Sequence, residues 1–359
     1  MCYRWSFFLF FSLLFFSCKE LDQNLQTRPG SFGKLNQINV IADEYIWDGA
    51  IGDTFFYYFE SPYPIMPSPE PIFDLRFFTV EQIKADELRR QLRTYIVLAD
   101  LSKTESPVTQ MVKEDLGVEK FEKALRDSSF NSLLGQDKWA RDQLIIYLFG
   151  NGEQALMESI VKNFPAAATR IKRHDEPQLE SNIYAARKND IGIQNLIMEW
   201  YGLEIKIPTD YKKVLSDEKN HFLWLRKDTK EDILNILFAK IAYRGSEQFE
   251  RDSIIAIRDF LGKSYISSEI AGSYMKTNVI DLPIYEQVFK LGGEAYTKEL
   301  RGIWEMENDF KGGPYFSYLI HNEKTSELIF VDAFILAPGK SKRNFMQQME
   351  YIIKSAVIR

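Results

Sequence analysis

The feature that most constrains the fold is an apolar segment near the C-terminal end, Leu328 to Ala337, which is followed by a helical pattern. As a strand, this segment is apolar on both of its alternating sides except at Asp332, so it needs cover on both faces, or one face lines a groove. We expect the Ile329 side to lie under the helix that follows, whose N-cap is expected to be Ser341. That helix has an apolar stripe typical of packing on a sheet. The stripe consists of Phe345, Met346, Met349, Ile352, Ile353 and Ala356.

Asp332 is the one charged residue within this apolar segment. A buried carboxylate without a partner is costly, so the pattern predicts a cation beside it. Arg301, on the strand expected next to it, is the partner that we predict. We interpret Asp332 and Arg301 as a structural pair in preference to a catalytic acid with its modulator, although a functional role stays open.

Alternating and helical apolar patterns along the chain predict an α+β fold. We expect two mixed or antiparallel sheet units flanked by helices and joined by a long helical segment, which is interrupted near Pro165 and Pro177. The two halves have a similar order of elements, so a duplicated unit is an open alternative. The expected divisions are a signal peptide (1–17), a lipidated cysteine with a flexible tether (18–36), an N-terminal unit with the helical connector (37–200) and a C-terminal unit (201–359).

Five prolines lie between residues 62 and 71. Proline fixes φ and has no N–H to donate to a strand ladder, so this stretch is expected to be an extended loop. A rigid crossover is our preferred interpretation. The alternative is a docking site for a partner with an aromatic-lined groove.

The N-terminal residues predict where the protein is located. Arg4 precedes an apolar run that ends at Phe16, which is shorter than the roughly 20 residues needed to span a bilayer but typical of a signal peptide. Ser17-Cys18 then resembles the lipobox of bacterial lipoproteins, which predicts lipidation of Cys18. We expect an outer-membrane lipoprotein that faces the periplasm or, because Lys19 is followed by acidic residues, is exported to the surface.

Composition limits the partners and the stabilising chemistry. The formal net charge of −6 argues against nucleic acid as a partner. Removal of the signal peptide takes Cys2 with it, so an internal disulfide is not expected. The 45% of hydrophobic residues is instead enough to stabilise a large body by burial. Membrane attachment is therefore expected through the lipid on Cys18.

No motif identifies a reaction. The three histidines are far apart in the sequence, so neither a metal site nor a cofactor is predicted. A glycosidase needs two nearby carboxylates, and residues 43–48 and 305–309 contain acids, but acids are common in this chain. Basic residues at the start of the last helix are candidates for contact with an anion or acidic glycan, because a helix N-terminus favours negative charge. The candidate residues are Lys340, Ser341, Lys342 and Arg343.

Several segments together resemble an uncharacterised family of Bacteroidota lipoproteins, domain-of-unknown-function family 4837. They include the lipobox, the segments 40–49 and 67–75, the run Arg301 to Met306, and residues 337–344. The resemblance implies an envelope lipoprotein over nearly the whole chain after cleavage, and it implies no catalytic residue.

We therefore expect a lipid-anchored, non-catalytic binding or assembly module of the cell envelope, with an envelope protein or a glycan as its partner. The alternative is an envelope hydrolase that acts on glycan or peptide through paired carboxylates. A pocket with two carboxylates, one of raised pKa, favours the hydrolase. An exposed aromatic patch on a packed body favours the binding module.

Overall fold

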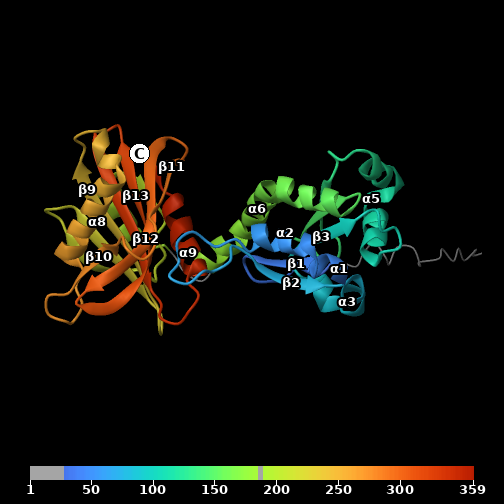
Figure 1. Ribbon diagram of the computed structural model, residues 1–359. Helices are drawn as coiled ribbons and strands as arrows, with labels where there is room; N and C mark the ends of the chain where they lie inside the picture. Colours follow the sequence, from blue (N-terminus) through green and yellow to red (C-terminus); the bar gives the residue numbers. More distant parts are fainter. Residues whose placement is uncertain (1–27, 185–188) are drawn as a thin grey trace, which may run out of the picture.

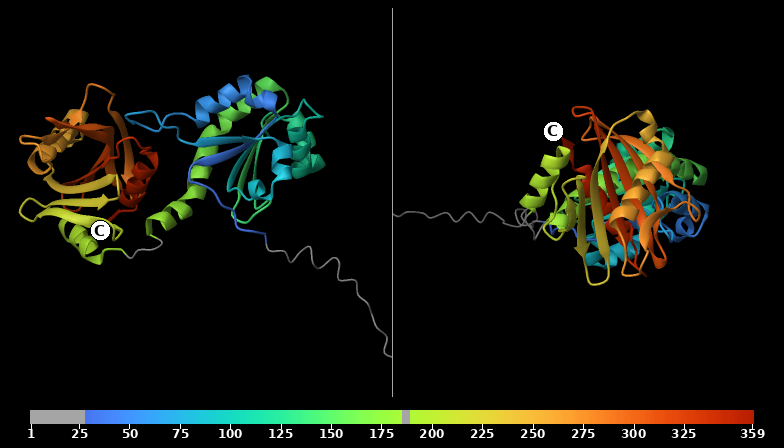
Figure 2. Two further views of the ribbon diagram at one scale, coloured as in Figure 1. Left: turned by 90° about the horizontal axis from the view of Figure 1, so that it is seen from below. Right: turned by 90° about the vertical axis from the view of Figure 1, so that its left-hand side faces the viewer.

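The computed structural model describes residues 28–184 and 189–359, which form two domains (Figure 1). The predicted signal peptide and Cys18 lie outside the described residues. The fold is α+β, as predicted. Figure 2 shows that the domains lie side by side and that the end of a long helix and one loop reach from the first domain to the second.

The N-terminal domain is a five-stranded mixed sheet covered by helices on both faces. The strand order is β2-β1-β3-β5-β4, and only β4 runs antiparallel to its neighbour. The central strands are continuous apolar runs because both of their faces are buried. The elements in chain order are β1 (Gln37–Ile41), α1 (Glu44–Trp47), α2 (Ala50–Phe59), β2 (Asp74–Phe78), α3 (Val80–Ala85), α4 (Glu87–Arg90), β3 (Thr94–Asp100), α5 (Pro107–Arg126), β4 (Ser132–Gln136), β5 (Leu144–Gly150) and α6 (Glu153–Tyr184).

The C-terminal domain is an eight-stranded antiparallel sheet with the order β10-β12-β13-β14-β9-β8-β7, and β11 also pairs with β12. Helices α7 and α9 cover one face, and α8 covers the other. The elements in chain order are α7 (Ile191–Tyr201), β6 (Leu203–Glu204), β7 (Lys212–Asp217), β8 (Phe222–Asp228), β9 (Ile233–Ala242), the 3-10 helix η1 (Ser246–Phe249), α8 (Arg251–Tyr265), β10 (Tyr274–Asn278), β11 (Tyr285–Leu291), β12 (Ala295–Glu307), β13 (Asp309–Asn322), β14 (Glu327–Leu336), α9 (Arg343–Lys354) and β15 (Val357–Ile358).

Strand β14 has the two-sided cover that its sequence demands. Ile329 and Val331 pack in the core under α9, and Leu328 and Phe330 pack in the core under α8. The predicted stripe of α9 is the face that is buried. The N-cap of α9 is Lys342, however, and its own side chain makes no capping bond, so the expectation for Ser341 was wrong.

Three expectations about the organisation of the chain need correction. The two sheets differ in strand direction and order, which argues against a duplicated unit. Helix α6 continues through Pro165 and Pro177, because its apolar residues on both sides of Pro165 pack on the sheet. Helix α7 belongs to the C-terminal domain, since Ile197 and Trp200 lie in its core, so the domain boundary precedes Ile191.

The end of the expected tether is docked on the N-terminal domain. The amide of Ser31 donates to the Arg141 carbonyl at 2.9 Å, and that of Phe32 donates to the Gln91 carbonyl at 3.0 Å. Asn36 is 5% exposed. These backbone bonds hold residues 31–36 in place, so a flexible tether to residue 36 was wrong for this part.

The residues between Ser61 and Ile72, called the proline loop below, form the expected extended segment. The loop closes on itself through backbone bonds from Tyr63 to Glu70 (2.7 Å) and from Ile72 to Ser61 (2.9 Å). Tyr63 and Met66 are buried in the core of the C-terminal domain. The loop therefore joins the two domains of the same chain.

Asp332 has a buried partner, but the partner is Arg258 of α8. The Arg258 Nε atom lies 3.1 Å from Asp332 Oδ1, and their side chains are 1% and 0% exposed. Ser317 donates to the same carboxylate oxygen at 2.6 Å. The predicted pairing with Arg301 is wrong, because the strand register places Arg301 with Phe316 on the opposite face of the sheet.

We expect Arg258→Ala to lower the free energy of unfolding by about 3–5 kcal/mol, because Asp332 is then a buried charge without its partner. Arg251→Ala is the matched control, since Arg251 lies on the same helix but is 52% exposed; its effect should stay within about 0.5 kcal/mol. Urea unfolding of both variants measures this, and equal effects would show that the Arg258 pair does not stabilise the domain.

Candidate functional site

The two domains meet around Arg301, a residue of β12 that is 4% exposed. Its Nη1 atom donates to the hydroxyl of Tyr63 at 3.1 Å, and its Nη2 atom donates to Glu350 of α9 at 2.7 Å. Its Nε atom donates to Glu299 on the same strand. Tyr63 comes from the proline loop, so a hydrogen-bonded group from the N-terminal domain completes a charge cluster of the C-terminal domain. We call Arg301, Glu299, Glu350, Tyr63 and Lys354 the Arg301 cluster.

The Arg301 cluster is held between aromatic rings. The guanidinium carbon lies 5.3 Å from the ring centroid of Phe316 and 5.7 Å from that of Tyr63, within the range of cation–π attraction. Tyr63 also donates to Glu350 at 2.9 Å. The cluster thus has the geometry of an ion network that is buried at Arg301 and Glu299 and reaches solvent at Lys354.

The pKa values of two carboxylates in this region are shifted in opposite directions. Burial favours the neutral form of Glu350, but the positive charges of Arg301 and Lys354 outweigh it and lower the pKa of Glu350 to about 2. Burial raises the pKa of Asp175, against the hydrogen bond from the Asn36 amide and the charge of Arg93. Burial also raises the pKa of Tyr63, so its hydroxyl stays a donor at neutral pH.

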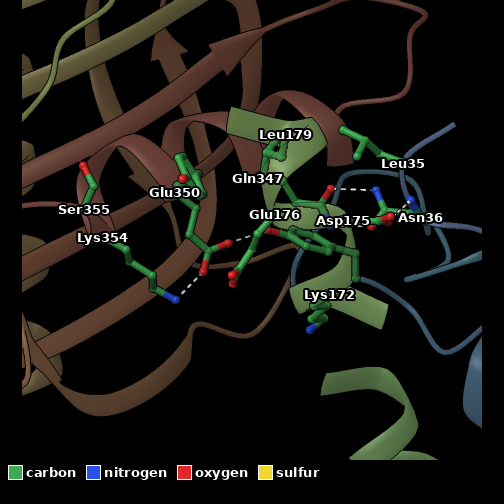
Figure 3. Close-up of a pocket in the computed structure, with 12 residues that line it drawn as sticks. Leu35, Asn36, Lys172, Asp175, Glu176, Leu179, Gln347, Glu350, Lys354 and Ser355 are labelled. Carbon is green, nitrogen blue, oxygen red and sulfur yellow. Dashed lines mark hydrogen bonds and ion pairs between the residues drawn. The ribbon is translucent and has the colours of Figure 1, made fainter. Parts of the chain in front are cut away.

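A cleft of about 500 Å³ opens beside the Arg301 cluster, between α6 and α9 (Figure 3). Its wall combines carboxylates, amines, amides, hydroxyls and two leucines. The lining residues are Leu35, Asn36, Tyr63, Lys172, Asp175, Glu176, Leu179, Gln347, Glu350, Tyr351, Lys354 and Ser355. The cleft thus has the size and the mixed lining of a small-ligand site, and domain interfaces are a common place for such sites.

One wall of the cleft joins the domains through side-chain amides. Asn36 donates to Gln347 at 2.8 Å and to Asn344 at 3.1 Å. The Asn36 backbone amide donates to Asp175 at 2.8 Å. A ligand in the cleft therefore contacts residues whose positions depend on how the two domains are docked.

The N-terminus of α9 binds a carboxylate of the protein itself, and the predicted contact with an external anion stays a prediction. The carboxylate of Glu70, in the proline loop, accepts hydrogen bonds from the backbone amides of Lys342 at 2.7 Å and Arg343 at 2.9 Å. Arg343 is buried and pairs with Asp74 at 2.7 Å. Glu70 thus occupies the end of α9 where the helix dipole favours negative charge.

The other predicted anion contacts do not form a free site. Lys340 pairs with Glu231 at 2.7 Å and Asp232 at 3.2 Å. Ser341 is exposed. Arg343 is paired with Asp74, and the Lys342 ammonium donates to the Lys340 carbonyl at 2.6 Å.

Of the residues that dominate the site, Arg301 was singled out from the sequence, but with another partner, and Glu350, Tyr63 and Glu70 were not. Glu350 carries a usable signal, because it falls between Met346 and Ile353 on the buried side of α9. A charged residue within such a stripe predicts a buried partner. Glu70 and Tyr63 carry no such signal, since only the folded proline loop brings them to the second domain.

The other acidic groups considered for hydrolysis are paired or lie apart. Glu305 and Glu307 both pair with Lys276, at 3.2 and 2.6 Å, and Asp43 accepts a hydrogen bond from Ser106. Among the described residues, no three His, Cys, Asp or Glu side chains are arranged to hold a metal ion. In the same part of the chain, no helix is both long enough and apolar enough to cross a membrane.

Comparison with known families divides the chain at the same place as the fold does. Residues 191–355 match the model of a domain of unknown function, DUF4837, and residues 31–184 match that of another, DUF8532. No curated protein matches the chain. The resemblance to DUF4837 therefore covers the C-terminal domain, while the segments 40–49 and 67–75 belong to the second match. The chain thus contains two domains of uncharacterised families.

Glu350 gives a pH dependence with a defined sign. Its ordinary pKa of 4.5 falls to about 2 in the folded protein, so its stabilising effect is complete above about pH 5 and is lost as the pH falls toward 2. The shift corresponds to about 3 kcal/mol. We expect Glu350→Gln to flatten the loss of unfolding free energy between pH 5 and pH 2.

Urea unfolding at a series of pH values measures this effect. Glu204→Gln is the control, because the Glu204–Arg359 pair is exposed. Parallel curves for the wild type and Glu350→Gln would contradict the assignment.

Glu70 gives a second prediction at the domain seam. Removing its carboxylate in Glu70→Ala leaves the amides of Lys342 and Arg343 without their acceptor. We expect these amides to exchange with deuterium about tenfold faster or more, since a charge-assisted bond contributes about 1.5–3 kcal/mol. Hydrogen exchange with mass spectrometry measures the change, with the exposed Glu81→Ala as control. Unchanged protection of α9 would show that Glu70 does not hold the helix.

Proposed function

We propose that this chain is a lipid-anchored protein of the cell envelope that acts as a non-catalytic binding or assembly module, with its ligand in the cleft between α6 and α9. The sequence before Cys18 supports the anchor and the envelope location. The family resemblance supports an outer-membrane lipoprotein of the Bacteroidota type, facing the periplasm or the surface. The net charge of −6 argues against nucleic acid as a partner.

The observation that carries the binding role is the position of the cleft. It has a volume of about 500 Å³, and both domains contribute to its wall. Residues from three segments far apart in the sequence, Asn36, Lys172 and Glu350, come together there. A ligand that contacts all three favours the docked arrangement of the domains, so binding stabilises the seam.

The chemistry of the cleft favours binding over hydrolysis. Glu350 has a pKa of about 2, so it cannot deliver a proton at neutral pH. Its two oxygens already accept from Arg301, Lys354 and Tyr63. Its place in the Arg301 cluster is therefore that of a structural anion.

One observation favours the alternative, an envelope hydrolase acting on glycan or peptide. The cleft holds two carboxylates whose pKa values are shifted in opposite directions, upward for Asp175 and downward for Glu350. Opposite shifts are typical of an acid with a nucleophile or base. The test is turnover of peptidoglycan fragments by the wild type and by Asp175→Asn. Turnover by the wild type that is lost in a folded Asp175→Asn variant would establish the hydrolase and overturn the binding role.

The anchor is tested at Cys18. Cys18→Ala should abolish fatty-acid labelling in cells and leave an uncleaved precursor, because the thiol is the acceptor of the lipid. Metabolic labelling with an alkyne fatty acid reads this out, with Cys2→Ala as the control that keeps both labelling and cleavage. Continued acylation of Cys18→Ala would refute the lipoprotein assignment.

The cleft is tested by site-specific cross-linking in cells. A photo-reactive phenylalanine analogue at Lys172, which lines the cleft and is exposed, should capture one envelope component reproducibly. The same analogue at Tyr57, which is 75% exposed on α2, is the control. Mass spectrometry identifies the adduct. Identical adducts from both positions, or none from Lys172, would contradict a ligand in the cleft.

A further inference from the structure

A second surface with the character of an interface lies on the C-terminal domain, along helix α8. The N-terminal domain docks on α9, which covers the opposite face of the sheet, so α8 lies on the side away from it (Figure 1). Phe260 of α8 is 69% exposed, whereas its neighbour Leu261 is 7% exposed. An exposed phenylalanine ring is informative where it lies beside further apolar surface.

That further surface is an apolar groove of about 490 Å³ between α8 and the strands β8 and β9. Its apolar lining comes from the sheet, with Phe222, Ala239 and Ile241, and from α8, with Ile257, Phe260 and Leu261. The rings of Phe222 and Tyr265 stack in the groove with centroids 3.8 Å apart, and the Tyr265 hydroxyl donates to Asp217 at 3.0 Å. These contacts fix the shape of the groove, so an exposed ring and a preformed apolar groove lie side by side.

The exposed side of α8 carries this ring within a stripe that has a charge of opposite sign at each end. The stripe consists of Asp252, Ala256, Phe260 and Lys263, all of them exposed. Residues three or four positions apart share one face of a helix, so the four side chains form a continuous row. We call this row the α8 stripe.

The charges of the α8 stripe define what can cover it. Asp252 lies in the first turn of α8 and Lys263 in the last. The Asp252 side chain pairs with the adjacent Arg251 but is 83% exposed, so its carboxylate can accept from a further cation. A second α8 laid antiparallel on the first brings Asp252 of each copy to Lys263 of the other, and it also aligns the two helix dipoles favourably. A parallel arrangement would bring like charges together.

We propose that two copies of this chain associate through the α8 stripe, antiparallel about a two-fold axis near Ile257, with each Phe260 ring packed in the groove beside the other copy's α8. A two-fold interface requires one surface that is complementary to itself. The α8 stripe meets this requirement twice, through the ring with its groove and through the two opposite charges. A bilayer or an acyl chain would cover the ring and the groove but would not pair the charges.

The first test is sedimentation velocity of the chain from residue 28 onward, which contains both folded domains. We expect a reversible monomer–dimer equilibrium. Phe260→Ala should weaken dimerisation about tenfold or more, because a buried aromatic anchor is lost from both halves of the interface. Tyr57→Ala is the matched control, since it removes a ring that is 75% exposed on the other domain, and it should dimerise like the wild type. A monomer at every concentration, or equal dimerisation of the wild type and Phe260→Ala, would overturn the proposal.

Charge exchange tests the antiparallel arrangement. Asp252→Lys and Lys263→Asp should each weaken dimerisation about fivefold, because each places like charges together at both ends of the stripe. The double variant should dimerise like the wild type, since it restores both pairs with their signs reversed. Circular dichroism checks that all three variants are folded. Single variants that dimerise like the wild type, or a double variant that does not recover, would overturn the arrangement.

Cross-linking tests the same arrangement without a change of affinity. The chain from residue 28 onward contains no cysteine, so an introduced thiol is unique. A mixture of Asp252→Cys and Lys263→Cys chains should be joined by a short bismaleimide much faster than either variant alone, because equal positions lie about 16 Å apart along an antiparallel pair. Faster cross-linking of Asp252→Cys with itself would overturn the arrangement. Binding to phosphatidylethanolamine–phosphatidylglycerol vesicles that is lost in Phe260→Ala, without any dimer, would overturn the whole proposal.

Discussion

The pairing of Arg301 with a carboxylate on α9 and a tyrosine on the proline loop is the interaction on which the two-domain structure depends. A guanidinium that is 4% exposed requires partners, and the C-terminal domain supplies the carboxylates of Glu299 and Glu350. Tyr63 adds the remaining acceptor from the other domain at 3.1 Å. Because a buried ion network is stable only when it is complete, docking of the N-terminal domain and order within the cluster are linked. The cleft beside the cluster is lined by both domains, so its shape also depends on their docking.

The seam between the domains combines charged, hydrogen-bonded and apolar contacts. The proline loop places Glu70 on the amides at the start of α9, and Asp74 pairs with Arg343. Asn36 adds amide bonds to α9 from a third segment. Tyr63 and Met66 of the proline loop and Ile183 at the end of α6 are buried in the core of the second domain. Such a mixed interface resembles a specific protein–protein contact, which suits a ligand site at its edge.

Sequence patterns predicted the parts of this protein that follow from local periodicity. The apolar strand β14, the stripe of α9 and the proline loop were all visible, because each depends on neighbouring residues. The partners of charged residues were not visible. Asp332 requires a cation, but register turns Arg301 of β12 to the opposite face of the sheet, whereas helix α8 brings Arg258 to the face of Asp332. The Lys340 to Arg343 segment indicated a preference for an anion, but only the fold shows that Glu70 already satisfies it. Tyr63 lies 287 residues from Glu350, beyond the reach of any local pattern.

The proline loop has a consequence for the order in which the molecule is assembled. The loop is synthesised early, yet its docking site consists of β12 and α9, which come almost last. Domains generally fold as units from the N-terminus, and contacts of large sequence separation form late. Tyr63 and Met66 therefore remain without their apolar surroundings until nearly the whole chain has been made. Completion of the seam is then a late step of folding. The proline loop of the first domain is buried only in a chain that has its last helix, α9.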